Sequence, residues 1–222
     1  MEQYIAGQKA AELKIDITQV VREYWEVVVL KGLFESPQGK YLIFKGGTAL
    51  RLTHGSPRFS EDLDFSLTGD ALRGRFGKLV KDIIRPHPEL SLTDLEEKHY
   101  TYLAEIKVTQ AYLKLPFRIK IEISKRKQKG KKKELKLLYS PVTNLQIVGQ
   151  VATMEQIYSD KLSCMKSRAK PKDFFDLWYL SEKLRIPYEA RRMSSKGKKE
   201  LVRELRKYLP RDFWPAIDSL AK

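Results

Sequence analysis

The sequence has little cysteine, few histidines and no long apolar run. Its 222 residues include one cysteine, Cys164, which excludes an internal disulfide and favours a reducing compartment. The three histidines, His54, His87 and His99, are too scattered to form a zinc site. No apolar run approaches the roughly 20 residues of a membrane span, and the N-terminus lacks the apolar core of a signal peptide. We therefore expect a cytoplasmic protein with no membrane partner.

Acidic residues are scarce relative to basic ones. The chain has 43 Lys and Arg residues but 28 Asp and Glu residues, which gives a net charge of +15. Such an excess favours a polyanionic partner, most often nucleic acid, although a generally lysine-rich proteome would give the same balance. Residues 125–136 hold eight basic residues and one acid. This stretch is either a solvated turn or a loop that contacts nucleic-acid phosphates.

Apolar patterning predicts an α/β (α+β) protein, with a mixed sheet, flanking helices and a helical C-terminal part. Residues 1–35 have the apolar stripe of a packing helix, and residues 117–124 alternate strictly between apolar and polar, as a strand does. Residues 153–185 read as two helices. We expect a core over residues 1–150 and a helical region over residues 151–222 that completes a cleft.

Turn and cap residues predict where several of these elements begin. Asp70 is expected to cap a helix that runs to about Ile84, since the residues between them carry an apolar face. Pro171 is suited to the first turn of the second helix within residues 153–185. Residues 193–199, with two serines and a glycine, are the best linker candidate.

The stretch from Tyr41 to Thr48 predicts a strand, a tight turn and a helix start. Residues 41–44 form a short apolar run that fits a buried strand. Gly46 and Gly47 then break the run, and Thr48 can cap the helix that follows. A glycine turn that opens a helix directs free backbone N–H groups at one point, which suits a phosphate.

Two acids follow in a second predicted strand. Residues two apart on a strand share a face, so Asp62 and Asp64 point together while Leu63 and Phe65 point to the core. Like charges this close repel each other unless a hard cation such as Mg²⁺ lies between them. An Asp-x-Asp pair alone is common on surface strands, but beside a phosphate-binding turn it indicates nucleotidyl transfer. Glu122, on the strand over residues 117–124, would add a third carboxylate if that strand pairs with this one.

The predicted helices near the C-terminus carry further charged candidates. Lys161 stands within an apolar stripe, where it either extends its charge to solvent or reaches into a cleft to bind a phosphate. Arg168 continues the same line two turns on. Asp173 and Asp176 share a face of the next helix. Asp173 lies in the first turn, where the helix dipole alone favours an acid, but the dipole explains the deeper Asp176 less well.

Four segments together resemble a known family. They are FKGGTALRL, RFSEDLDF, KIEIS and EQIYSDKLSCMKSRAKPKDFFDLWYL. The combination resembles the AbiEii/AbiGii-type nucleotidyltransferase toxins, which include the MenT-like toxins and belong to the DNA-polymerase-β-like minimal nucleotidyltransferase superfamily. The resemblance covers roughly Leu42 to Leu180, and each segment alone is less specific than the set.

The resemblance implies a role for individual residues. Asp62 and Asp64 would bind Mg²⁺ or Mn²⁺, with Glu122 as the third carboxylate. Lys161 and Asp176 would complete the catalytic set. The nucleotide would be bound by Lys45, Gly46, Gly47, Thr48, Ser60, Lys161 and Arg168, and Arg58 and Asp173 also match the family pattern. Because Gly47 stands where the family usually has serine, the hydroxyl of Thr48 is displaced by one position.

The function implied by the resemblance is that of a toxin from a toxin–antitoxin or phage-abortive-infection system. Such a toxin would transfer a nucleotide from a nucleoside triphosphate (NTP) to RNA, with the 3′ end of tRNA as the expected acceptor and an antitoxin protein as a partner. Two alternatives remain open: a nucleotidyltransferase that modifies a protein, and a non-catalytic basic protein of this fold that binds RNA or an antitoxin.

Overall fold

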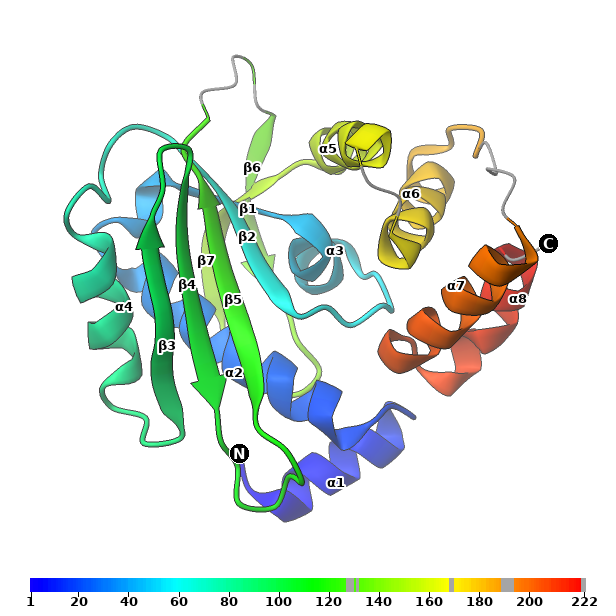
Figure 1. The fold of residues 1–222 in the computed structure, drawn as a ribbon, viewed down its shortest axis with the longest axis horizontal. Coiled ribbons are helices and arrows are strands. Elements are labelled where there is room, and N and C mark those ends of the chain that lie inside the picture. The colour runs from blue at the N-terminus through cyan, green and yellow to red at the C-terminus, as the bar shows by residue number, and fades with distance from the viewer. Residues whose placement is uncertain (127–129, 131, 168–169, 189–193, 221–222) are drawn as a thin grey trace.

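A seven-stranded mixed sheet forms the centre of the molecule in the computed structural model (Figure 1). The structure describes residues 1–126, 130, 132–167, 170–188 and 194–220. The strand order is β3-β4-β5-β2-β1-β7-β6. The strands are β1 (Leu42–Lys45), β2 (Asp62–Leu67), β3 (Leu90–Glu97), β4 (Thr101–Val108), β5 (Phe117–Ser124), β6 (Lys133–Leu138) and β7 (Ile147–Ala152). The predicted mixed α/β architecture is therefore confirmed.

The sheet has four antiparallel and two parallel strand pairs. β2 runs antiparallel to β1 and parallel to β5, and β1 runs parallel to β7. The outer pairs β3–β4, β4–β5 and β6–β7 are antiparallel. β2 therefore lies in the middle of the sheet, where both of its edges are paired and its side chains have fixed positions.

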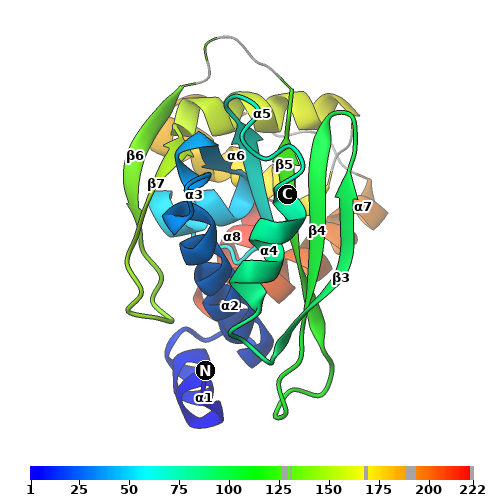
Figure 2. The same ribbon diagram turned by 90° about the vertical axis from the view of Figure 1, so that its left-hand side faces the viewer.

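Two helices cover one face of the sheet, as Figure 2 shows: α2 (Ile17–Glu35) and α4 (Phe76–Ile84). Their apolar sides pack with the buried side chains of the strands in one large core. From β2 this core receives Leu63 and Phe65, both fully buried. Because side chains alternate along a strand, Asp62 and Asp64 point to the opposite face.

The C-terminal helices form a second core on the other side of the sheet. They are α5 (Met154–Ser167), α6 (Pro171–Leu184), α7 (Ser195–Tyr208) and α8 (Trp214–Leu220). Their buried residues pack around Ile43 of β1 and Leu50 of α3 (Gly46–His54). α3 lies between the sheet and α6, and the Tyr179 hydroxyl donates a 2.7 Å hydrogen bond to the His54 carbonyl (Figure 1). The two cores therefore meet at α3.

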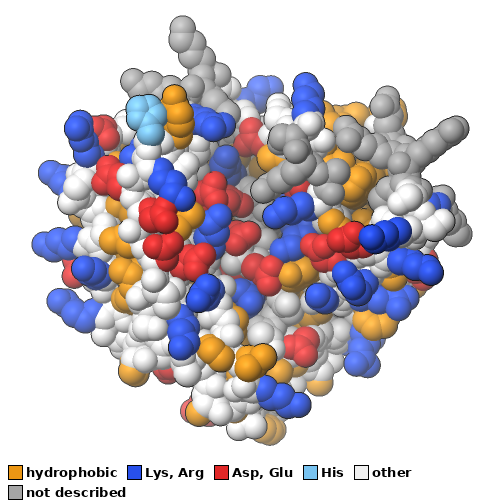
Figure 3. All heavy atoms as spheres, in the orientation of Figure 1, with side chains coloured by type: hydrophobic (Ala, Val, Ile, Leu, Met, Phe, Trp, Pro, Cys, Tyr) orange, Lys and Arg blue, Asp and Glu red, His pale blue; other side chains and the backbone are white. Residues whose placement is uncertain are grey.

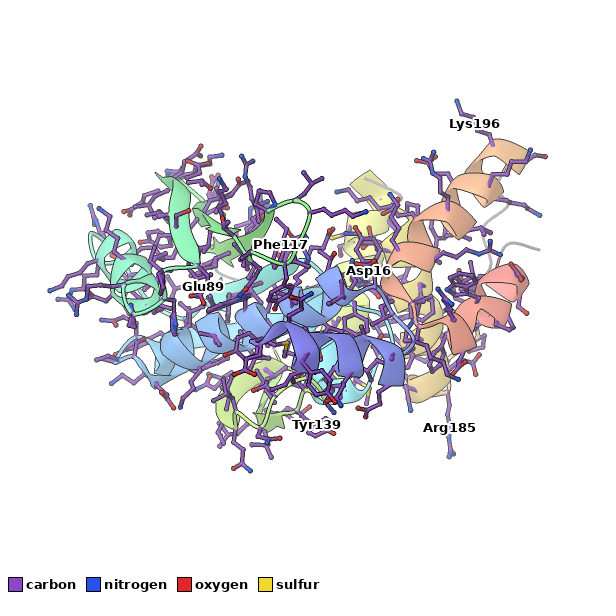
Figure 4. All side chains as sticks on the ribbon, turned by 90° about the horizontal axis from the view of Figure 1, so that it is seen from below. Asp16, Glu89, Phe117, Tyr139, Arg185 and Lys196 are labelled. Carbon is purple, nitrogen blue, oxygen red and sulfur yellow. The ribbon has the colours of Figure 1, made fainter. Side chains whose placement is uncertain are left out.

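Several predicted boundaries were wrong. The predicted helix over residues 1–35 is two helices, α1 (Gln3–Glu12) and α2, and the Asp16 side chain caps the second one (Figure 4). α4 begins at Phe76 rather than after Asp70. α7 begins at Ser195 with Ser194 as its cap, so most of the predicted linker over residues 193–199 is helical. The end of the basic stretch, from Lys133, is strand β6. The expected division at residue 150 stays a prediction, and β7 extends past it to Ala152.

No helix in the described part of the chain is long and apolar enough to span a membrane.

Candidate functional site

Strand pairing places the predicted carboxylates beside one another. In the register of β2 with β5, Asp62 lies opposite Lys120 and Asp64 opposite Glu122. On the other edge of β2, Asp64 lies opposite Lys45 of β1. The condition attached to Glu122, that its strand pairs with the Asp62–Asp64 strand, is met. Three carboxylates therefore share one face of two neighbouring strands.

The pKa of Asp64 is raised above the usual value for an aspartate. Burial is the largest cause that raises the pKa of Asp64 to about 6. The negative charges of Asp62 and Glu122 also raise this pKa, whereas the positive charges of Lys45 and Lys161 lower it. The negative charge at this point is thus not fully compensated by the protein. A bound cation would relieve it, because cations lower the cost of ionising nearby carboxylates.

Glu122 has a partner of its own. Its Oε2 accepts a 2.7 Å hydrogen bond from Nζ of Lys120, two residues earlier on the same face of β5. Among the described residues, no group of three or more His, Cys, Asp or Glu side chains is arranged to hold a metal ion. Asp62 and Asp64 lie on the same face of β2 and offer two carboxylates of the kind that divalent cations prefer, whereas the role of Glu122 as a metal ligand stays a prediction.

The glycine turn makes room for two side chains of the site. Gly46 has φ +82°, and a Cβ at this position would overlap the Asp64 carboxylate. A Cβ on Gly47 would overlap the Arg58 guanidinium and approach Ser60 Oγ. The N-terminus of α3 thus lies directly against Asp64. Its free backbone N–H groups are suited to a phosphate, as the sequence predicts.

Thr48 does not begin the helix. Lys45 is the N-cap residue, so Thr48 lies within the first turn of α3. The Thr48 hydroxyl donates a 2.6 Å hydrogen bond to the Asp62 carbonyl, which ties α3 to β2. Lys45 Nζ lies 3.8 Å from Asp160 Oδ2 of α5. The roles of Lys45, Thr48 and Ser60 in nucleotide binding stay predictions.

A buried ionic network lies behind the carboxylates. Nζ of Lys161 is 2.8 Å from Asp173 Oδ1 and 2.6 Å from Asp176 Oδ2. Arg58 also binds Asp176, through Nε at 2.7 Å and Nη2 at 2.8 Å. Burial alone would lower the pKa of Lys161, but the two aspartates outweigh it and raise the pKa, so this lysine carries a charge. The network therefore fixes a charged ammonium close to Asp64.

Sequence patterns did not reveal Glu61, which joins three segments. Glu61 Oε2 accepts hydrogen bonds from Lys172 Nζ at 2.8 Å and from the Tyr208 hydroxyl at 2.6 Å. Arg22 Nη2 of α2 lies 3.6 Å from its Oε1. These contacts connect α2, α6 and α7 next to Asp62. Because these partners lie far apart in the sequence, the only sequence signal for Glu61 was its position directly before Asp62.

Two predicted features cannot be placed in the structure. Arg168 lies outside the described residues, as do residues 127–129 and 131 of the basic stretch.

The predicted site does not coincide with the cavity between α2 and α4. This cavity has a volume of about 940 Å³, and none of the predicted site residues lines it. Figure 3 shows instead that acidic side chains gather at the middle of the face that carries the site, with basic side chains around them.

Solved structures share this fold. JHP933 from Helicobacter pylori is 22% identical, with 93% of this chain and 91% of that chain covered and a TM-score of 0.55. A putative nucleotidyltransferase from H. pylori is also 22% identical, with 93% and 94% covered and a TM-score of 0.56. MenT4, a nucleotidyltransferase toxin from Mycobacterium tuberculosis H37Rv, is 16% identical, with 92% and 70% covered and a TM-score of 0.61. These likenesses establish the nucleotidyltransferase fold.

A family model identifies the sequence itself. No curated protein matches the chain significantly. The model for the nucleotidyl transferase AbiEii toxin of type IV toxin–antitoxin systems matches residues 28–213, which contain the glycine turn, the carboxylates and the buried ionic network. The chain belongs to the AbiEii family of nucleotidyltransferase toxins.

Proposed function

We propose that this nucleotidyltransferase transfers a nucleoside monophosphate from an NTP to RNA, with the 3′ end of tRNA as the acceptor, in the cytoplasm. The observation that carries the proposal is the contact between the start of α3 and Asp64. It joins a backbone phosphate site to a pair of carboxylates that fits a divalent cation. Membership of the family implies an NTP substrate and an antitoxin partner.

Asp62 and Asp64 would hold Mg²⁺. When bound there, this ion would neutralise charge on the triphosphate and align its phosphates. The chain's own cations would add to that effect. Lys161 is held in place by Asp173 and Asp176, and its ammonium opposes the charge that develops on the phosphates in the transition state.

The reaction would be an in-line displacement. The terminal hydroxyl of the acceptor gives up its proton to solvent and its oxygen forms a bond to the α-phosphorus of the NTP, while the bond between that phosphorus and the bridging oxygen breaks and pyrophosphate leaves. The backbone N–H groups at the start of α3 hold the phosphates in position. Lys45, at the N-cap, can contact them from the neighbouring strand.

Net charge supports a nucleic acid as the acceptor. The chain carries a net charge of +15, while acidic side chains gather at the middle of the site face (Figure 3). The basic excess therefore lies outside the carboxylate group, where it can contact an RNA backbone without competing for the metal. Lys196, for example, projects into solvent from the start of α7 (Figure 4).

Incubation with labelled NTPs, Mg²⁺ and total tRNA tests the proposal. Wild-type protein should label RNA, and Asp62→Ala should reduce labelling by at least about 10²-fold because the cation site is lost. Asp70→Ala, which removes an aspartate with a 69% exposed side chain in a turn outside the site, is the matched control and should leave labelling unchanged. If protein is labelled and RNA is not, the acceptor is a protein rather than RNA. No labelling of either would contradict the proposal.

A further inference from the structure

Lys120 lies among the carboxylates of the candidate site. Sheet register places it opposite Asp62 on β2 and opposite Glu105 on β4. Along its own strand it contacts Glu122, with 2.7 Å between Nζ and Oε2. Acidic residues therefore neighbour Lys120 on three sides, although its side chain keeps 36% of its surface exposed.

The other cations near the carboxylates have different partners. Lys161 binds Asp173 and Asp176, and Lys45 Nζ lies 3.8 Å from Asp160 Oδ2. On β5, Arg118 pairs with Glu105 at 3.3 Å. Lys120, by contrast, pairs with Glu122, a carboxylate of the predicted metal set.

The charges of the group balance with one divalent ion. Asp62, Asp64 and Glu122 together carry three negative charges when ionised. A divalent cation on the two aspartates compensates two of them, and the Lys120 ammonium compensates the third. A second divalent ion at Glu122 would have to displace Lys120 and would meet its positive charge at close range.

We propose that the Lys120 ammonium takes the place of a second metal ion, so that the site holds one divalent cation on Asp62 and Asp64. Glu122 then positions Lys120 instead of binding metal. This inference rests on the proposed function, because it assumes a cation site on the two aspartates. Glu122 is thus the positioning residue, and Lys120 supplies a fixed charge at any Mg²⁺ concentration.

A count of bound ions tests the inference without measuring catalysis. Mn²⁺ is titrated into the protein with one equivalent of a non-hydrolysable α,β-methylene NTP, and free Mn²⁺ is followed by electron paramagnetic resonance. Wild type should bind one Mn²⁺ per chain, and Lys120→Met should bind two. Lys120→Arg keeps the positive charge and should still bind one. Lys98→Met is the matched control, because Lys98 also pairs with a glutamate on the sheet, Glu96 at 2.6 Å, and it should bind one.

Other results would overturn the inference. Two ions in wild type, or one ion in a Lys120→Met protein with wild-type circular dichroism, would show that Lys120 does not replace a metal. Glu122→Gln gives a second check: its Mn²⁺ affinity should stay within about twofold of wild type, whereas a tenfold loss would make Glu122 a ligand. If wild type holds its Mn²⁺ no more tightly than Asp62→Ala or the free nucleotide does, the proposed metal site itself fails. That result is distinct from a wrong ion count.

Discussion

Arg58 binds Asp176 in a bidentate, buried ion pair that joins parts of the chain 118 positions apart. The two side chains are only 2% and 0% exposed. Arg58 precedes β2, whereas Asp176 lies on α6, so the pair fixes the segment before the carboxylates against the C-terminal helices. Asp176 also binds Lys161 at 2.6 Å. We therefore expect Asp176 to position Arg58 and Lys161 rather than to contact the substrate.

Replacement of Asp176 by alanine should destabilise the protein strongly. Removing one partner of a buried ion pair leaves uncompensated charges, here Arg58 and Lys161, and typically costs about 3–5 kcal/mol. Urea denaturation measures this free energy of unfolding. The matched control is Asp212→Ala, which breaks a pair with Lys14 whose side chains are 62% and 55% exposed. That change should cost less than about 1 kcal/mol, and equal losses in both variants would contradict the expectation.

The stabilising effect of Asp176 should depend on pH. Burial alone would raise the pKa of Asp176, but Arg58 and Lys161 lower it from 3.8 to about 2. A carboxyl whose pKa is lower in the folded state stabilises the fold above its unfolded pKa, and this contribution is lost as pH falls from about 4 to about 2. The lowered pKa corresponds to about 2 kcal/mol.

Urea unfolding of wild type and Asp176→Asn across a pH series checks this dependence. The difference in unfolding free energy between the two proteins should be constant from about pH 5 to pH 8 and should shrink below about pH 4. Asp212→Asn serves as the exposed control, and its difference from wild type should be small throughout. If the difference in unfolding free energy instead grew as pH fell below about 4, the predicted direction of the pKa change would be wrong.

The local part of the site could be predicted from the sequence. Alternation alone placed Asp62 and Asp64 on one face and Leu63 and Phe65 in the core, because a strand repeats every two residues. The same argument chose Glu122 as the third carboxylate. Its position beside Asp64 depended on which strands pair, and this is set by long-range packing that no local pattern encodes.

The contacts between distant segments could not be predicted. The family pattern included Arg58, yet only the folded chain shows that it binds Asp176 beneath Gly47. The glycine turn also has a second role. The sequence explained the two glycines by a phosphate site. In the structure, glycine is required at these positions because a Cβ would overlap the Asp64 and Arg58 side chains. Thr48 failed as a helix cap because the helix starts two residues earlier, at Gly46.

Gly46→Ala should inactivate the enzyme by displacing Asp64. The new Cβ would overlap the Asp64 carboxylate, and φ +82° adds backbone strain of about 1–2 kcal/mol. We expect nucleotidyl transfer to fall by about 10²-fold, since a small misplacement of a catalytic group has effects of that size. Gly74→Ala is the control that distinguishes backbone strain from steric overlap. Gly74 also has a positive φ, +61°, but a Cβ at this position would meet no atom within 4 Å. It should lose similar stability but keep its activity, and full activity in Gly46→Ala would contradict this account.

Loss of the Tyr208 hydroxyl should loosen the C-terminal helices. This hydroxyl donates a 2.6 Å hydrogen bond to Glu61, and the Tyr208 carbonyl accepts one from the Phe59 backbone at 2.8 Å. Tyr208→Phe removes only the side-chain bond. Because that bond ends on a charged group, we expect a loss of about 1.5–3 kcal/mol in urea denaturation.

Amide hydrogen exchange shows where the Tyr208→Phe protein opens. Faster exchange should appear in α7 and in the segment before β2, because Tyr208 connects these two elements. The central strands β1 and β2 should keep their protection, since both edges of each strand are paired. Tyr139→Phe, which removes a hydroxyl from a 71% exposed side chain, is the control and should change neither stability nor exchange. Uniformly faster exchange in Tyr208→Phe would mean that the bond stabilises the whole fold rather than the attachment of α7.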